Sequence, residues 1–267
     1  MTTKPKILVL RADGTNCDEE LAFAFNLAGG DAEFVHVNEL RSKEKKFSDF
    51  QILALPGGFA YGDDIVSGKI LAVELTSFFS EELQKFIDHK DTLVVGICNG
   101  FQVLIRTGLL PFRNIGTMDA TLTNNDSGLF ECRWVKIKQE KSRCVFLKET
   151  NDIMDVSVNH GEGKFFADAE VIKKVEDEDL VVFRYVDAHS KPTSIYPNNP
   201  NGSTNAIAGI CDPTGRIIGM MPHPEKFHHV TNHPNWRRMK YLPAGRQVDK
   251  PQGLPIFENM IDYVTNA

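Results

Sequence analysis

Residues 93–102 read Leu-Val-Val-Gly-Ile-Cys-Asn-Gly-Phe-Gln, an apolar, largely β-branched run that leads directly into Gly-x-Cys-x-Gly and an amphipathic stretch. This order is typical of a nucleophile elbow, a strand, a sharp turn and a helix, with Cys98 in place of the usual serine. The two glycines favour a strained turn, because a Cβ at either position would clash with neighbouring strands. We also expect the helix N-terminus to lower the pKa of the thiol. By itself the segment fits a buried strand cysteine equally well.

A base for such a nucleophile lies far along the chain, in residues 220–225 (MMPHPE), after an apolar strand-like run. A nucleophilic cysteine needs a base, and the base needs a third group that fixes its tautomer. His223 and Glu225 are two residues apart, so in an extended segment the carboxylate lies beside the imidazole. The flanking prolines disfavour a helix there. Together Cys98, His223 and Glu225 predict a catalytic triad.

The first half of the chain alternates strand-like and helix-like runs, which predicts an α/β fold with a mostly parallel central sheet flanked by helices. We expect strands at residues 7–10, 32–37, 52–55 and 93–97, and helices at residues 18–28, 66–79, 80–89 and 101–108. Ligands bind at the carboxyl ends of strands in such sheets. Both the Gly57-Gly58 turn and Cys98 fall at such ends, which predicts one shared site.

Additional β structure is predicted in the second half. Strand signals cover residues 129–138 and 170–185, the latter interrupted by the charged run 173–179. Residues 206–212 and 216–221 are expected to form a hairpin around Pro213-Thr214-Gly215. Residues 242–247 resemble a flexible insertion, and residues 256–264 predict a closing amphipathic helix.

Length and composition favour one soluble domain. With 267 residues and 42% hydrophobic content, the chain is near the upper size of a single domain, so we expect one domain over 1–267 with a C-terminal extension of unknown role from about 228. The net charge of −6 argues against a nucleic-acid partner. No apolar run is long enough for a membrane span or a signal peptide, so no membrane partner and a cytoplasmic location with reduced cysteines are expected.

The sequence lacks the usual cofactor motifs. Neither Gly-x-Gly-x-x-Gly nor a Walker-type Gly-Lys-Ser/Thr occurs, so we expect no nucleotide or other cofactor in this chain. His228, His229 and His233 have no supporting acidic or cysteine ligands, and we expect no metal site. Cys17 and Cys132 lie near other motifs, so each could line the site, but packing is the preferred interpretation for both.

A set of six motifs resembles the class I (triad) glutamine amidotransferases, and within them the glutaminase subunits of phosphoribosylformylglycinamidine synthases. The motifs are residues 56–63 (PGGFAYGD), 96–102 (GICNGFQ), 130–134 (FECRW), 160–165 (HGEGKF), 198–203 (NNPNGS) and 220–225 (MMPHPE). Their order along most of the chain makes the resemblance specific. It implies the flavodoxin-like fold of that family.

The resemblance also implies an activity. Members of the family are enzymes that hydrolyse glutamine to glutamate and ammonia. The ammonia then passes to a separate synthetase subunit, which converts formylglycinamide ribonucleotide to its amidine in de novo purine biosynthesis. The whole reaction is that of a ligase that forms a C–N bond with glutamine as nitrogen donor. ATP and Mg²⁺ are expected in that synthetase, and a small accessory subunit is expected beside it.

Residue roles follow from the same resemblance. Cys98 is expected to be the nucleophile, His223 the base and then the acid, and Glu225 the group that orients His223. Backbone N–H groups of Gly58 and Asn99 are expected to form the oxyanion hole. The positions expected to hold glutamine are Gln102, His160, Gly161 and Glu162. Residues 198–202 are placed near the substrate or partner side, with an ordinary surface turn as the alternative.

Other functions stay open at this point. A glutaminase subunit of another amidotransferase, or a γ-glutamyl hydrolase or protease-like enzyme on the same fold, would use the same three residues. A non-catalytic scaffold subunit is a third alternative. The complete set Cys98, His223 and Glu225 argues against a scaffold, because a scaffold has no need of all three.

Overall fold

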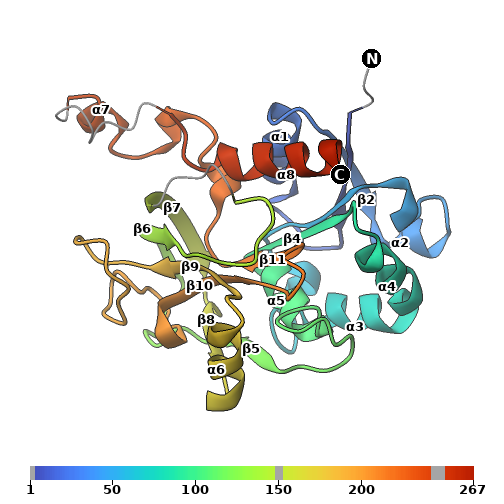
Figure 1. The fold of residues 1–267 in the computed structure, drawn as a ribbon, viewed down its shortest axis with the longest axis horizontal. Helices are drawn as coiled ribbons and strands as arrows, with labels where there is room; N and C mark the ends of the chain where they lie inside the picture. Colours follow the sequence, from blue (N-terminus) through green and yellow to red (C-terminus); the bar gives the residue numbers. More distant parts are fainter. Residues whose placement is uncertain (1–3, 148–152, 242–249) are drawn as a thin grey trace.

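The computed structural model describes residues 4–147, 153–241 and 250–267, and a nine-stranded sheet runs through it in the order β2-β1-β3-β4-β11-β10-β9-β6-β7 (Figure 1). The strands are β1 (Lys6–Arg11), β2 (Asp31–His36), β3 (Ile52–Leu55), β4 (Leu93–Ile97), β6 (Glu131–Gln139), β7 (Ile153–His160), β9 (Val181–Tyr185), β10 (Ile207–Cys211) and β11 (Ile217–Met220). A separate ladder joins β5 (Ala120–Thr123) to β8 (Lys164–Ala167). Strands from β2 to β11 in this order are parallel, and the remaining pairs are antiparallel. The predicted α/β fold with added β structure is confirmed.

Helices cover both faces of the parallel strands. On one face α1 (Asp18–Leu27) packs against α8 (Leu254–Asn266), and on the other lie α3 (Lys69–Phe78), α4 (Ser80–Asp88) and α5 (Asn99–Thr107) (Figure 1). Every residue of β3 and β4 is therefore buried, as in parallel strands covered on both faces. The remaining helices are α6 (Ala169–Asp177) and the short α2 (Val37–Arg41) and α7 (Trp236–Met239).

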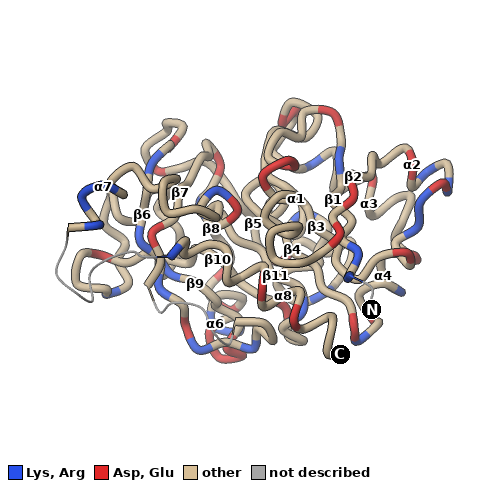
Figure 2. Tube along the Cα trace, turned by 90° about the horizontal axis from the view of Figure 1, so that it is seen from above, with Lys and Arg blue, Asp and Glu red and all other residues tan. Residues whose placement is uncertain are grey.

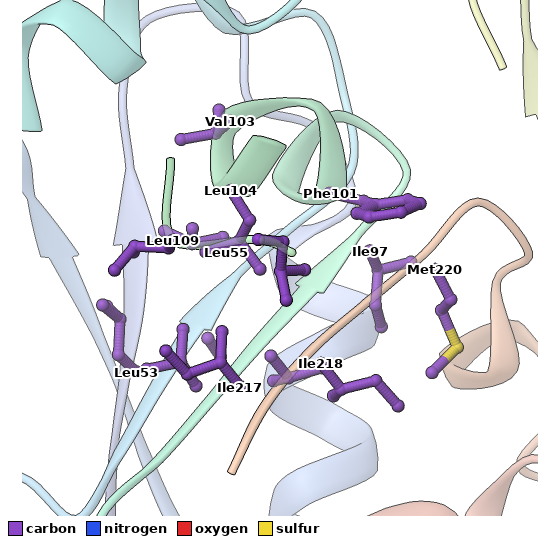
Figure 3. Close-up of a cluster of buried hydrophobic side chains, with 14 of the residues drawn as sticks. Leu53, Leu55, Ile97, Phe101, Val103, Leu104, Leu109, Ile217, Ile218 and Met220 are labelled. Carbon is purple, nitrogen blue, oxygen red and sulfur yellow. The ribbon is translucent and has the colours of Figure 1, made fainter. Parts of the chain in front are cut away.

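An apolar cluster fixes α5 against the strands beneath it (Figure 3). Phe101 and Leu104 of α5 are fully buried over Leu55 and Ile97. A Cβ on Gly219 of β11 would lie only 2.0 Å from the ring of Phe101, so glycine there allows the ring to rest directly on the strand. Burial of a large apolar side chain contributes about 1.5–3 kcal/mol. This packing holds the turn between β4 and α5 in place.

Charged side chains avoid the central strands. In Figure 2 acidic and basic residues are interspersed along the outside of the trace, whereas β3, β4 and β11 carry no charged residue. Among the helices that the structure describes, none is both long and apolar enough to cross a membrane.

Most predicted elements are confirmed, but residues 170–185 are not one interrupted strand. Residues 169–177 form α6, and only residues 181–185 form a strand, β9. Ile172 and Val175 are buried at helical spacing, while the charged residues between them face outward. The β-branched residues suggested a strand, but their period is that of a helix. Helix α3 also begins three residues later than predicted, after Gly68 in a left-handed conformation (φ +74°).

The end of the chain joins the core. The predicted closing helix is present as α8, which buries Phe257 and Met260 and places the ring of Phe257 5.0 Å from that of Phe25 in α1. The predicted insertion at residues 242–247 lies outside the described residues.

Candidate active site

Cys98 occupies a strained turn between β4 and α5. Its backbone has φ +52° and ψ −105°, a region that residues other than glycine rarely adopt. The backbone N–H of Cys98 donates to the carbonyl of Met220 (2.8 Å), and its thiol donates to the carbonyl of Asn159 in β7 (3.4 Å). The predicted elbow is confirmed, with α5 beginning directly after Cys98 rather than at residue 101.

Both glycines of the elbow are required by space. A Cβ on Gly100 would lie 2.0 Å from the carbonyl oxygen of Leu55 in β3, which is the clash with a neighbouring strand that the sequence predicts. A Cβ on Gly96 would lie 2.6 Å from the carbonyl oxygen of Gly100. That second clash is with the helix and not with a strand, so the expectation was wrong in this detail.

His223 and Glu225 form a buried pair. The Nδ1 of His223 lies 2.5 Å from Oε1 of Glu225, and both side chains are 1% exposed. The expected contact between carboxylate and imidazole is present, but its local cause is different. Residues Pro224–Lys226 form a 3₁₀ turn instead of an extended segment, because a proline fits the first position of such a turn.

Three strand ends bring these residues to one edge of the sheet. Strand β4 pairs in parallel with β11, with Ile97 opposite Met220, so Cys98 and His223 both follow the carboxyl ends of adjacent strands. Gly57 follows β3 on the other side of β4, and a Cβ on it would lie 2.8 Å from Cε1 of His223. Because β4 lies between β3 and β11, the segments that follow β3 and β11 meet across the end of β4, which Cys98 directly follows. Ligands bind at such an edge in α/β sheets.

Burial controls the ionisation of Cys98. Desolvation raises the pKa of its thiol well above the ordinary value, and the electrostatic influence of Cys17 and of the Glu225 carboxylate acts in the same direction. The backbone N–H of Asn99 at the start of α5 lowers this pKa, as expected, but desolvation outweighs it, so the net shift is upward. The thiol is neutral in the resting site, so a reaction at Cys98 needs a base.

Cys17, for which packing was the preferred interpretation and a place in the site the alternative, lies close to the histidine–glutamate pair. Its Sγ, a ring nitrogen of His223 and a carboxylate oxygen of Glu225 all lie within 4.8 Å of one another. Burial, followed by the charge of Glu225, raises the pKa of the Cys17 thiol to about 11. Cys17 lies in the segment after β1, which neighbours β3 in the sheet. Because ligands bind at the carboxyl ends of parallel strands, this position is the sequence signal that could have placed Cys17 in the site.

The side chains of Asn99 and Gln102 connect the elbow to two loops. The Nδ2 of Asn99 donates to Oδ1 of Asp63 (2.9 Å) and to Oε1 of Gln102 (2.9 Å), and its Oδ1 accepts from the N–H of Ala60 (3.2 Å). The Nε2 of Gln102 donates to the carbonyl of Glu162 (2.6 Å). These hydrogen bonds fix the positions of the elbow, the segment after β3 and the turn after β7 relative to one another.

A pocket of about 530 Å³ opens beside this network, and its lining includes Phe59, Asp63, Phe130, Gly161 and Glu162. Its volume lies within the usual range of small-molecule pockets. Glu162 is also within 3.7 Å of Arg106, which balances its charge. Of the turn predicted to hold substrate, Gly161 and Glu162 line the pocket.

His160 lies behind the pocket. Its side chain is 2% exposed, and its Nδ1 is 3.1 Å from Oδ1 of Asn125. Burial, together with the nearby His223, lowers the pKa of His160 to about 3, so its ring is neutral. It acts as a structural hydrogen-bonding group in the described contacts.

Within the loop of residues 198–203, the side chains of Asn199, Asn201 and Ser203 are part of this buried polar network. Asn201 is fully buried, and its Nδ2 donates to the carbonyl of Gly163 (2.8 Å) and to the hydroxyl of Tyr185 (3.2 Å). The Oγ of Ser203 accepts from the N–H of Phe165 (3.0 Å). The interpretation as an ordinary surface turn is wrong, because the loop supports the 160–163 turn from behind.

A cysteine in an elbow and a buried histidine–glutamate pair, which follow adjacent parallel strands, fit the site expected of a glutamine amidotransferase, and comparison with known proteins shows that family. The chain belongs to the CobB/CobQ-like glutamine amidotransferase domain family, whose model matches residues 4–264.

Individual relatives narrow the class further. The chain is 44% identical over 262 residues to phosphoribosylformylglycinamidine synthase subunit PurQ of Dehalococcoides mccartyi, with 98% of each chain covered. It is 32% identical to phosphoribosylformylglycinamidine synthase of Drosophila melanogaster, covering 98% of this chain and 19% of that protein. A chain in the structure of PurLQS from Thermotoga maritima superposes with a TM-score of 0.71 at 27% identity, covering 98% of this chain and 99% of that one. The resemblance found in the motifs is confirmed.

Proposed function

We propose that this chain is the glutaminase subunit of a phosphoribosylformylglycinamidine synthase. It hydrolyses glutamine to glutamate and ammonia, and the ammonia serves the ATP-dependent conversion of formylglycinamide ribonucleotide to formylglycinamidine ribonucleotide in purine biosynthesis. The observation that carries this is the elbow cysteine, which shares a sheet edge with the buried His223–Glu225 pair. The full-length similarity to PurQ proteins supports the particular pathway.

The proposed reaction runs through a covalent intermediate. His223 accepts the thiol proton of Cys98 as Sγ attacks the carboxamide carbon of glutamine. His223 then delivers that proton to the departing ammonia, which leaves a γ-glutamyl thioester. A water molecule, deprotonated by the same imidazole, attacks the thioester; the C–S bond breaks to release glutamate, and Sγ of Cys98 takes the proton back from the imidazolium. Glu225 holds the ring at Nδ1 and stabilises the imidazolium that forms in each half-reaction.

Backbone N–H groups of Gly58 and Asn99 are the proposed oxyanion hole. Each such donor contributes about 3–4 kcal/mol to stabilisation of the tetrahedral intermediate. Gly58 has φ +138°, and a Cβ on it would lie 2.6 Å from the backbone nitrogen of Asn16, so only glycine fits. The hydrogen bond between Asn99 Oδ1 and the N–H of Ala60 fixes the loop of Gly58 relative to the elbow.

Glutamine is proposed to bind in the pocket beside Gly161 and Glu162. Gln102 contributes through its bond to the carbonyl of Glu162, which sets the position of the turn. His160 contributes from behind, through its contacts with Asn125 and Asn201. In this arrangement the backbone of the turn does much of the binding.

The proposed partner is a synthetase subunit, which binds ATP and Mg²⁺ and contains the second active site. This chain needs no cofactor of its own for the proposed chemistry. The likeness to a chain in the PurLQS structure supports such an assembly. A small accessory subunit and a cytoplasmic location complete the proposal.

Labelling with a glutamine-mimicking chloroketone tests the role of Cys98 directly. We expect one equivalent on Cys98, protection by glutamine, and no label on Cys98→Ala. Cys132→Ala is the matched control, because Cys132 is an exposed free thiol, and it should be labelled at Cys98 as in the parent. Glutamine-protected label that persists in Cys98→Ala would contradict the proposal. Competition by short γ-glutamyl peptides stronger than by glutamine would favour a γ-glutamyl hydrolase instead.

A further inference from the structure

A second chemical feature lies within the site, at the buried histidine–glutamate pair itself. Among the residues that the structure describes, Cys17, His223 and Glu225 form the group whose ligand atoms are close enough to hold a metal ion. All three side chains are buried, with relative exposures of 7%, 1% and 1%. The triad chemistry uses His223 and Glu225 but has no role for Cys17.

Two buried atoms in this group lack a hydrogen-bond partner. They are Nε2 of His223 and Oε2 of Glu225. A buried polar atom without a partner costs free energy, so each calls for an explanation. The proton transfer proposed above explains Nε2. It leaves Oε2 unexplained, because only Oε1 contacts the imidazole.

We propose that a thiophilic divalent cation of the Zn²⁺ class binds here through Cys17, His223 and Glu225. Thiolate, imidazole and carboxylate are the ligands that Zn²⁺ prefers, and water completes a tetrahedral site. Mg²⁺ and Ca²⁺ are disfavoured, because they prefer sites built from oxygen ligands alone. Binding releases the thiol proton of Cys17 to solvent, while His223 binds as the neutral imidazole.

The spacing of the ligand atoms suits this ion after a small closure. Ligand atoms at zinc distances of about 2.0–2.3 Å are separated from one another by about 3.3–3.8 Å in a tetrahedral site. The corresponding atoms here lie within 4.8 Å. Metal binding therefore requires these separations to shorten, with Sγ of Cys17 leaving its hydrogen bond to Oδ1 of Asn16 (3.3 Å).

The ammonium of Lys226 competes with such a cation. It interacts with Cys17 and Glu225, and it supplies positive charge beside them. A bound cation therefore has to displace this ammonium, whose side chain is only half-buried and leads to the surface. Removal of the charge at Lys226 should strengthen cation binding.

A cation at this place has a consequence for the proposed glutaminase, and this step rests on that proposed function. A metal ion bound to the His223 ring occupies a nitrogen that either receives the thiol proton or contacts Glu225. The ring can then no longer serve as the oriented base. Zn²⁺ is thus a reversible inhibitor of glutamine hydrolysis that acts through Cys17.

The binding test uses Zn²⁺ and the full chain carrying Cys98→Ala, which removes an alternative site made from Cys98 and His223. Calorimetric titration should give one equivalent, and adding Cys17→Ala should weaken binding at least tenfold. Adding Cys132→Ala instead should leave binding unchanged, and adding Lys226→Met should tighten it. Glu225→Gln, which keeps the size of the side chain, should also weaken binding and serves if the Cys17 variant is poorly folded. Unchanged affinity on removal of Cys17 or of the Glu225 charge overturns the site.

The inhibition test separates this inference from the proposed function, because the binding test needs no turnover. In the reconstituted complex, Zn²⁺ should inhibit glutamine-dependent synthesis by the parent, and Cys17→Ala should resist that inhibition at least tenfold. Ammonia-dependent synthesis is the internal control for effects of Zn²⁺ on the synthetase. Equal inhibition of parent and Cys17→Ala would contradict the inhibitory role.

Discussion

At the scale of single residues, the pair His223–Glu225 has two unequal roles. His223 moves a proton in every step of the proposed reaction, whereas Glu225 orients it through one hydrogen bond. His223→Ala should therefore lower kcat for glutamine hydrolysis at least about tenfold more than Glu225→Gln. Steady-state rates of the two variants in the complex measure this difference. Equal losses would show that the roles are assigned wrongly.

His160 makes stability depend on pH. Burial lowers its pKa to about 3 in the folded chain, whereas an unfolded histidine titrates at about 6.5. Between these values the unfolded chain binds the extra proton, so the contribution of His160 to stability falls as the pH drops below about 6.5. The slope is at most about 1.4 kcal/mol per pH unit.

His160→Gln removes this titration. The variant should be less stable than the parent at pH 7.5, because it loses contacts to Asn125 and Asn201. The difference should narrow as the pH falls towards 5. Urea unfolding of both proteins at several pH values measures it, and a gap that widens on acidification would mean that His160 is charged in the folded state.

The sequence identified the residues that stand in motifs and missed those that depend on the fold. Cys98, His223 and Glu225 are marked by glycines, prolines and spacing. The partners of Cys17 come from a segment distant in the chain, so no local pattern reveals them. Likewise, nothing in the sequence says that Asn201 is buried against His160, since asparagine is usually exposed in loops.

At the scale of elements, Gly100 joins α5 to β3. A Cβ there would lie 2.0 Å from the carbonyl oxygen of Leu55, which is backbone and has no room to move. Gly100→Ala should therefore cost more than about 3 kcal/mol of unfolding free energy and disturb the elbow.

Gly29→Ala is the matched control for this substitution. Gly29 has φ +101° but nothing within 4 Å of an added Cβ, so only backbone strain of about 1–3 kcal/mol is expected. Urea unfolding compares the two variants. A smaller loss for Gly100→Ala than for Gly29→Ala would contradict the close approach of helix and strand.

Elements buried on both faces were the easiest to predict. Residues 52–55 and 93–97 are continuous apolar runs, and they form β3 and β4 with the predicted bounds. Residues 169–177 were harder, because Val171, Ile172 and Val175 favour strands by composition, while their spacing fits a helix. Where only one face of an element is buried, the spacing of its apolar residues predicts helix or strand better than their composition does.

At the scale of the whole molecule, we propose that residues 1–267 form a single glutamine amidotransferase domain that includes the C-terminal segment. Helix α8 supports this proposal, since Phe257 is fully buried against Phe25. Phe257→Ala should cost about 3–5 kcal/mol. Glu258→Ala, at an exposed neighbouring position, should change stability by less than about 0.5 kcal/mol. Equal thermal unfolding of both variants would mean that α8 is dispensable for the fold.

The order of strands explains why residues so far apart in the chain share one site. Strands β3, β4 and β11 are neighbours in the sheet, and the segments that follow them carry Gly57, Cys98 and His223. The parallel arrangement could be predicted from the alternation of strands and helices. The insertion of β11 beside β4 could not, because β11 belongs to the part of the chain that otherwise forms antiparallel pairs.

The role of Cys98 as the nucleophile is tested most directly by the activity of Cys98→Ala in complex with the synthetase, with glutamine and with free ammonia as nitrogen donors. Amidine formation from glutamine should fall to background, while formation from ammonia should proceed at the rate of the parent complex. Glutamine-dependent amidine formation that survives the loss of Cys98 would contradict its role as the nucleophile.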